Sequence, residues 1–231
     1  MSTNRFGTAE HCVTIPVGDG RRLPRWLFLR LLGIVYIIAF WSLWSQLDGL
    51  IGPDGIVPAD LHMKRMEALV AANENLSWWH IPTLSWFLGA QLGTLETFCG
   101  AGILLGAGLV AGVWPRGVLL GLWILYLSLF TLSSPFLNFQ WDILLLETTV
   151  LAIFYAPAGL RPKLRASREP STIAVWLLRL LLFKLMLSSG VVKLNSGDPS
   201  WSDLTALNYH FWTQPIPHQL AWHAHHMGDW F

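Results

Sequence analysis

The chain has 231 residues, of which 53% are hydrophobic and 13% are charged, and its formal net charge at pH 7 is +1. Soluble domains carry about 25% charged residues, so the composition excludes an ordinary soluble domain and predicts a polytopic membrane protein. A nearly balanced charge without a dense cluster of Lys and Arg excludes nucleic acid as a partner. Cys12 and Cys99 lie in the polar amino-terminal segment and in a predicted membrane helix, so no disulfide framework is expected.

Five apolar segments follow one another along the chain, and each is close to the ~20 residues that a membrane-spanning helix needs. The tight break at Ser133-Ser134-Pro135 predicts that the third and fourth form an antiparallel hairpin. In the second segment, Gly102-x3-Gly106 permits close contact with another helix. The predicted fold class is all-α, a polytopic membrane helix bundle of about five transmembrane helices within residues 26–194. The five segments are residues 26–47, 91–113, 117–133, 139–156 and 173–194.

Lys and Arg fall mostly on one side of this five-span arrangement. Nine of them precede the first span, or lie between the second and third spans or between the fourth and fifth, whereas only Lys64 and Arg65 lie on the other side. Because cytoplasmic loops carry the excess of Lys and Arg, residues 1–25 are predicted to be a cytoplasmic tail. The nine residues are Arg5, Arg21, Arg22, Arg25, Arg116, Arg161, Lys163, Arg165 and Arg168.

Two segments are predicted to lie outside: a loop, residues 48–90, and a tail, residues 195–231. In the loop a short helix is expected from Asp60, and in the tail a short interfacial helix is expected after the turn at residues 214–217. The tail is rich in Trp and His, and its end at Phe231 indicates the start of a further region. The residues expected to meet the bilayer surface or an apolar client are Trp201, Trp212, Gln214, Trp222 and Trp230.

Ionisable side chains inside the predicted spans need partners or a purpose, because a charged group at the centre of a helix costs about 2.5–3.5 kcal/mol to insert. Glu147 and Lys184 lie near the middle of their spans, whereas Asp142 and Lys193 lie near the outer ends. We therefore predict structural ion pairs Glu147–Lys184 and Asp142–Lys193. The two acidic residues are about 140° apart around their helix, so both pairs cannot lie on one seam, and Glu96 is an alternative partner for a lysine.

Two interpretations of these charges stay open. They are static pairs that fix helix register, or Glu147 and Lys184 are an acid and a base with shifted pKa values. No residue is assigned as catalytic, because the sequence has no Gly-rich phosphate loop, no Gly-x-Ser-x-Gly elbow and no His-Glu-x-x-His. The protein is therefore expected not to be an enzyme.

The outer histidines, His210, His218, His223, His225 and His226, fit no standard metal-binding spacing. We predict neither a metal site nor a cofactor, and His223 and His226 are the residues that would be tested first as ligands.

A series of motifs in the second half of the chain resembles the lipase maturation factor family. It begins with Phe139-Gln-Trp-Asp-Ile-Leu-Leu-Leu-Glu and continues through residues 177–194. It ends with Gly197-Asp-Pro-Ser-Trp and Thr213-Gln-Pro-Ile-Pro. The similarity extends from about Trp26 to the end of the chain.

The resemblance implies an integral membrane factor that assists folding, assembly or maturation of exported proteins. Family members in animals lie in the endoplasmic reticulum membrane and serve dimeric secreted lipases such as lipoprotein lipase; bacterial relatives would lie in the inner membrane. The implied partners are the lipid bilayer and a secreted lipase or other exported client. Alternative readings are a membrane enzyme distantly similar to vitamin K-dependent carboxylases, using Glu147 and Lys184, or a proton-relay or transport role for the same residues.

A double-mutant cycle separates the two interpretations of the central charges. If Glu147 and Lys184 form a structural pair, Glu147→Gln and Lys184→Met each lower folding yield, because each leaves one charge unpaired, and the double mutant recovers yield and biological activity. Yield is measured by size-exclusion chromatography of detergent-purified protein. A double mutant that folds but stays inactive supports the acid–base interpretation instead.

Overall fold

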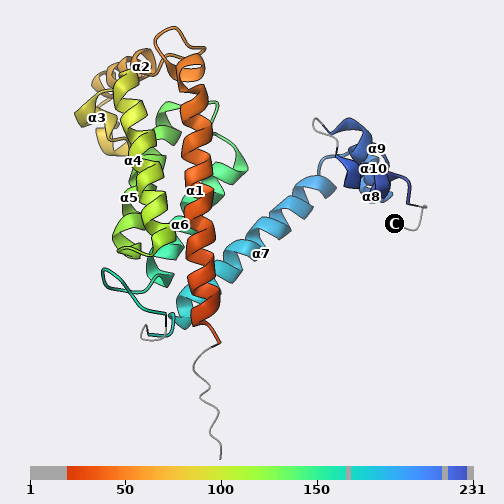
Figure 1. Cartoon of the computed structure of the whole chain (residues 1–231). Helices are drawn as coiled ribbons and strands as arrows, with labels where there is room; N and C mark the ends of the chain where they lie inside the picture. The colour runs from red at the N-terminus through yellow and green to blue at the C-terminus, as the bar shows by residue number, and fades with distance from the viewer. Residues whose placement is uncertain (1–19, 165–167, 215–217, 228–231) are drawn as a thin grey trace, which may run out of the picture. The chain divides into compact units, whose positions relative to one another are not determined.

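The computed structural model describes residues 20–164, 168–214 and 218–227. Within these residues every regular element is a helix (Figure 1), which confirms the all-α fold class. Each of the five predicted segments is helical. The long helices are α1 (Arg22–Ile51), α4 (Leu92–Ala111), α5 (Pro115–Leu132), α6 (Gln140–Tyr155) and α7 (Thr172–Leu194). The short ones are α2 (Ala59–Ala72), the 3-10 helix η1 (Trp78–His80), α3 (Ser85–Leu88), α8 (Pro199–Ser202), α9 (Ala206–Thr213) and α10 (Gln219–His225).

Four of the described helices, α1, α4, α5 and α7, are long and apolar enough to cross a membrane. The chain is therefore a multi-pass membrane protein. α6 has 16 residues, which is about 24 Å at ~1.5 Å per residue and shorter than the ~30 Å hydrocarbon core. The fourth predicted segment is thus helical but shorter than a typical span.

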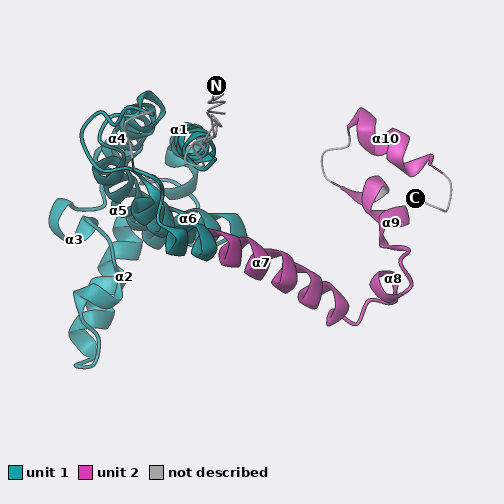
Figure 2. Cartoon of the chain, turned by 90° about the horizontal axis from the view of Figure 1, so that it is seen from below, with its two compact units in different colours: residues 1–177 teal, residues 178–231 magenta. Residues whose placement is uncertain are grey.

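The chain divides into two compact units, residues 1–177 and residues 178–231, and the boundary falls inside α7 (Figure 2). The first unit contains α1 to α6 and the beginning of α7. The second contains the rest of α7 and the short helices α8, α9 and α10, of which α9 and α10 contact each other. The short helices expected after Asp60 and after residues 214–217 are present as α2 and α10.

The connections of the first unit gather at two opposite ends (Figure 1). The start of α1, the α4–α5 connection and the described residues 156–164 and 168–171 share one end, where the Trp114 amide donates to the Leu160 carbonyl oxygen at 2.7 Å. At the same end Arg25 Nη2 donates to the Arg168 carbonyl oxygen at 2.8 Å. α2, η1 and α3 lie at the other end. The described basic residues that were predicted to share one side of the membrane therefore share one end of this unit.

Close contact between α1 and α4 depends on glycine. A side-chain carbon on Gly102 would lie 2.5 Å from the Phe40 ring, and one on Gly106 would lie 3.2 Å from the Gly33 carbonyl oxygen. The ring of Phe40 is fully buried, so it cannot move aside. Gly102-x3-Gly106 thus lets α1 and α4 approach each other closely, as small residues do in membrane helix pairs.

Gly102→Ala is expected to destabilise the bundle by about 1–3 kcal/mol, the usual cost of an extra carbon in a filled core. Gly93→Ala is the matched control, because it lies in the same helix with no atom within 4 Å of an added carbon. Thermal unfolding in nanodiscs should show a lower midpoint for Gly102→Ala and an unchanged or slightly higher one for Gly93→Ala. Equal midpoints for the two variants would contradict this account of the α1–α4 contact.

Candidate functional site

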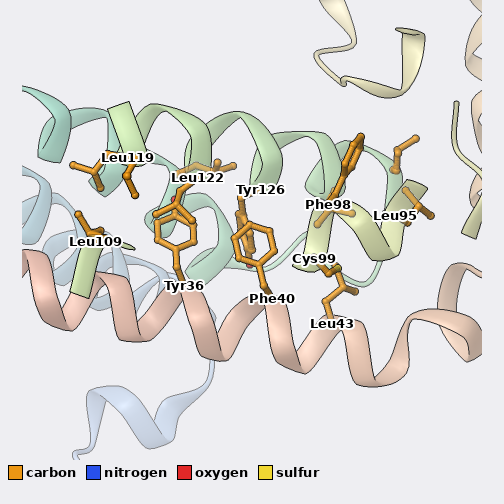
Figure 3. Packing of buried hydrophobic residues seen from close by; sticks show 14 of the residues in the cluster. Tyr36, Phe40, Leu43, Leu95, Phe98, Cys99, Leu109, Leu119, Leu122 and Tyr126 are labelled. Atoms are coloured by element: carbon orange, nitrogen blue, oxygen red, sulfur yellow. The ribbon is translucent and has the colours of Figure 1, made fainter. Parts of the chain in front are cut away.

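Three aromatic rings meet at the centre of the first unit, where α1 and α5 face each other (Figure 3). The Tyr126 ring lies edge-on to Tyr36 and Phe40, with centroid separations of 5.7 and 5.5 Å. Tyr36 and Phe40 stack along α1 at 5.9 Å. All three side chains are buried, and edge-on aromatic pairs at these separations are favourable beyond the area they bury.

The hydroxyl of Tyr126 donates to Asp142 Oδ1 on α6 at 2.6 Å. The other carboxylate oxygen, Oδ2, accepts the backbone amide of Phe139 at 3.2 Å. Asp142 lies in the first turn of α6, where the positive end of the helix dipole favours an acidic group. These contacts explain how a carboxylate that is only 3% exposed can be accommodated in an apolar bundle.

A second buried hydrogen bond joins α1 to α6. Tyr36 Oη lies 2.6 Å from Thr149 Oγ1, and Thr149 Oγ1 donates to the Leu145 carbonyl oxygen at 2.7 Å. A hydroxyl has one proton, so Tyr36 is the donor to Thr149. The two tyrosines therefore connect α1 and α5 to the same helix, α6.

A groove opens beside this junction, with a volume of about 750 Å³. Its walls are the second half of α1, residues 135–137 and 139 and the first turns of α6, and Tyr126 and Asp142 lie among its lining residues. Most of the other lining residues are apolar, such as Val35, Ile38 and Leu145. The groove resembles a typical ligand site, which is mostly apolar with a few polar groups.

The Tyr126–Asp142 pair holds α5 and α6 together. Both carboxylate oxygens accept hydrogen bonds, and the described residues that line the groove include no histidine, lysine or cysteine.

The ionisable residues predicted to form pairs fall in different parts of the chain. Asp142, Glu147 and Glu96 belong to the first unit, where Glu147 is half-buried on α6 and Glu96 is exposed on α4. Lys184 and Lys193 belong to the second unit, and Lys193 Nζ lies 4.9 Å from the centre of the Trp201 ring. The Glu147–Lys184 and Asp142–Lys193 pairs stay predictions, whereas Asp142 has the hydrogen-bond partners described above.

The predicted contact residues of the tail are placed only in part. Trp201 is half-buried on α8, and Gln214 directly follows α9. Trp222 is 59% exposed on α10 and its ring stacks on His226 at 4.1 Å. The side chain of Trp212 and all of Trp230 lie outside the described residues. Among the residues that the structure describes, no three potential ligands, His223 and His226 included, gather as a metal site would need.

Two features were missed by the sequence analysis. The first is the set of buried hydroxyls of Tyr36, Tyr126 and Thr149, which could have been identified because a hydroxyl inside a membrane span must find an internal partner.

The second feature is an exposed group of aromatic side chains at the end where α2 and α3 lie. It is formed by Trp78, Trp79 and Phe87, and we call it the outer aromatic patch. Their exposed fractions are 52%, 61% and 72%, and the Trp78 ring lies edge-on to both others at 5.7 and 5.9 Å.

The family model and the relatives that match this chain all belong to one family. Residues 23–231 match the family model described as "Lipase maturation factor transmembrane domain". The chain is 43% identical over 223 residues to Lipase maturation factor 2 of Xenopus tropicalis, covering 91% of this chain and 30% of that protein. It is 42% identical over 227 residues to Lipase maturation factor 2 of Homo sapiens, covering 91% and 31%.

Lipase maturation factor 1 of Mus musculus is 32% identical over 215 residues, covering 90% of this chain and 37% of that protein. The chain therefore spans about a third of the length of the curated relatives it matches. No solved structure matches the chain.

Replacing each tyrosine by phenylalanine tests which of the two buried hydrogen bonds contributes more to the free energy of unfolding. Tyr126→Phe should cost about 1–3 kcal/mol, because it leaves a buried carboxylate oxygen without its donor. Tyr36→Phe should cost at most about 1 kcal/mol, because Thr149 keeps its bond to the Leu145 carbonyl. Unfolding midpoints of the two variants in nanodiscs give the comparison, and a larger loss for Tyr36→Phe would contradict the assignment of Asp142 as the critical acceptor.

Proposed function

The chain belongs to the lipase maturation factor family, and on that premise we propose that it assists the folding, assembly or maturation of an exported protein, a secreted lipase being the client that the family name suggests. The observation that carries this proposal is the family match over residues 23–231. Because the chain spans about a third of the length of its relatives, its share of that function is the part performed by a membrane domain.

We propose that the amino terminus is cytoplasmic and that the end carrying α2, η1 and α3 faces the compartment of the exported client. The gathering of basic residues at the opposite end supports this orientation. The membrane is that of the endoplasmic reticulum in a eukaryote and the inner membrane in a bacterium. In this arrangement residues 1–25 are a cytoplasmic tail, residues 26–194 form the membrane domain with an outer loop at 48–90, and residues 195–231 lie outside.

The outer aromatic patch is a client-contact surface in this proposal. Large apolar side chains that are exposed together mark interaction sites more often than single exposed residues do, and aromatic residues are enriched among the residues that dominate binding. Trp222 on α10 and Trp201 on α8 are further candidates from the second unit. An alternative role for exposed Trp is anchoring at the membrane interface, and the experiment below separates the two roles.

Substitution of the patch should reduce client maturation. The host gene is deleted and complemented with the complete protein that contains this chain, either wild type or carrying Trp79→Ala and Phe87→Ala. We expect the specific activity of secreted lipase to fall severalfold in the variant, because truncation of an aromatic anchor typically costs about 2 kcal/mol or more of binding free energy. Lipase activity is normalised to secreted lipase mass.

Ile56→Ala is the matched control, because Ile56 is 73% exposed in the same outer loop but lies outside the patch. Its lipase activity should equal that of the wild type. Equal activities in the deletion strain and the wild type would overturn the proposed function itself. A functional wild type with a fully active patch variant would instead remove the patch from the client surface.

A further inference from the structure

A second cavity, of about 580 Å³, lies at the basic end of the first unit. Its walls come from the start of α1, the start of α5, the end of α6 and residues 168–171. We call it the basic pocket, because Arg25, Arg116 and Arg168 are among the residues that line it. It is separate from the groove beside Tyr126, which lies toward the other end of α1.

Two of these arginines are held in place by backbone carbonyl oxygens. Arg25 Nη2 donates to the Arg168 carbonyl oxygen at 2.8 Å, and Arg116 Nε donates to the Ala156 carbonyl oxygen at 3.0 Å. Each guanidinium has five N–H groups in a fixed plane. A guanidinium that is anchored through one nitrogen loses less rotamer entropy when the others bind a ligand. Arg116 is therefore a pre-positioned donor in the pocket.

Positive charge exceeds negative charge in the pocket. Its lining contains three arginines and one carboxylate, that of Glu169. Glu169 Oε1 lies 2.9 Å from Nε of Arg22, which is not among the lining residues, so this carboxylate is already engaged by a fourth arginine. An anion with several oxygens matches the remaining charge and the bidentate geometry of arginine.

The position of the pocket favours a ligand that belongs to the membrane. Arg116 is the second residue of α5, a helix of membrane-spanning length and composition, and such termini lie near the level of the lipid headgroups. Phe154 also lines the pocket and is 66% exposed. The arginine donors match the charged headgroup of a phospholipid, and the exposed aromatic ring beside them matches its apolar acyl chain.

We propose that the basic pocket binds the phosphate of an anionic phospholipid from the surrounding leaflet, with the start of an acyl chain along Phe154. Arg116 and Arg168 contact the phosphate oxygens, and Arg25 holds the segment at 168–171 against α1 through its bond to the Arg168 carbonyl. Basic pockets between membrane helices are known to suit anionic headgroups. The inference concerns lipid binding and does not depend on the proposed function.

The competing explanation is that these arginines only set topology, since basic residues concentrate on the cytoplasmic side of membrane proteins in general. That explanation requires charge at this end of the unit but not at particular positions. Arg161 offers the comparison, because it is exposed, lies in the same connection and is not among the lining residues.

The test uses the complete protein in nanodiscs of phosphatidylcholine mixed with phosphatidylglycerol, and native mass spectrometry counts each lipid retained after release. We expect wild-type protein to retain phosphatidylglycerol selectively. Arg116→Gln and Arg168→Gln should each lower this selectivity about fivefold, the effect of roughly one basic residue near an anionic surface. Arg161→Gln, which removes the same charge outside the pocket, should leave the selectivity unchanged.

Equal losses in all three variants, or no loss in the two pocket variants, would overturn the proposal. Arg168→Gln keeps the test valid if Arg116→Gln does not fold, because residue 168 accepts the hydrogen bond from Arg25 through its backbone carbonyl oxygen. In nanodiscs of phosphatidylcholine alone, soluble glycerol phosphate is added as a second probe. If it binds with the same dependence on Arg116 and Arg168 while phosphatidylglycerol is not selected, the ligand is a free phosphate compound and the lipid assignment is wrong.

Discussion

The bundle of the first unit depends on the requirement that every polar group inside a membrane find a partner within the protein. Tyr126 satisfies Asp142, and Tyr36 satisfies Thr149, so two hydroxyls from α5 and α1 meet acceptors on α6. The rings that carry these hydroxyls pack on Phe40, which in turn fits against Gly102 of α4. One set of contacts therefore fixes the relative positions of four helices. A change at Phe40 or Gly102 disturbs the packing, and loss of either tyrosine hydroxyl removes a buried hydrogen bond.

The two ends of the first unit have different chemistry. One end is rich in arginine, and two of these arginines, which line a pocket, donate hydrogen bonds to backbone carbonyl oxygens. The other end carries the outer aromatic patch. A membrane protein with a basic end and an aromatic end is suited to a fixed orientation in the bilayer. The proposed contact with an exported client needs such an orientation, because only one end would meet the client.

Some residues of the candidate site could be predicted from the sequence, and others could not. Asp142 stands out in the sequence, because an acidic side chain next to an apolar run needs a partner; we placed it near the outer end of its span, whereas the structure buries it. Its hydrogen-bond donor was not identified, since Tyr126 lies on another helix and sequence spacing does not say which faces of two helices meet. The outer aromatic patch was missed for a similar reason: Trp78, Trp79 and Phe87 come together only through the turn between η1 and α3.

The sequence alone determined the fold class, the five helical segments and the membrane location, because long apolar stretches dictate helices whose backbone bonds are satisfied locally. It also determined the family, through motifs whose order is independent of their arrangement in space. Only the tertiary structure decided which polar groups pair, where α1 approaches α4 and which arginines share a pocket. These outcomes depend on the rotation and crossing of each helix, and those are set by side-chain packing between distant segments rather than by hydrophobic periodicity within one segment.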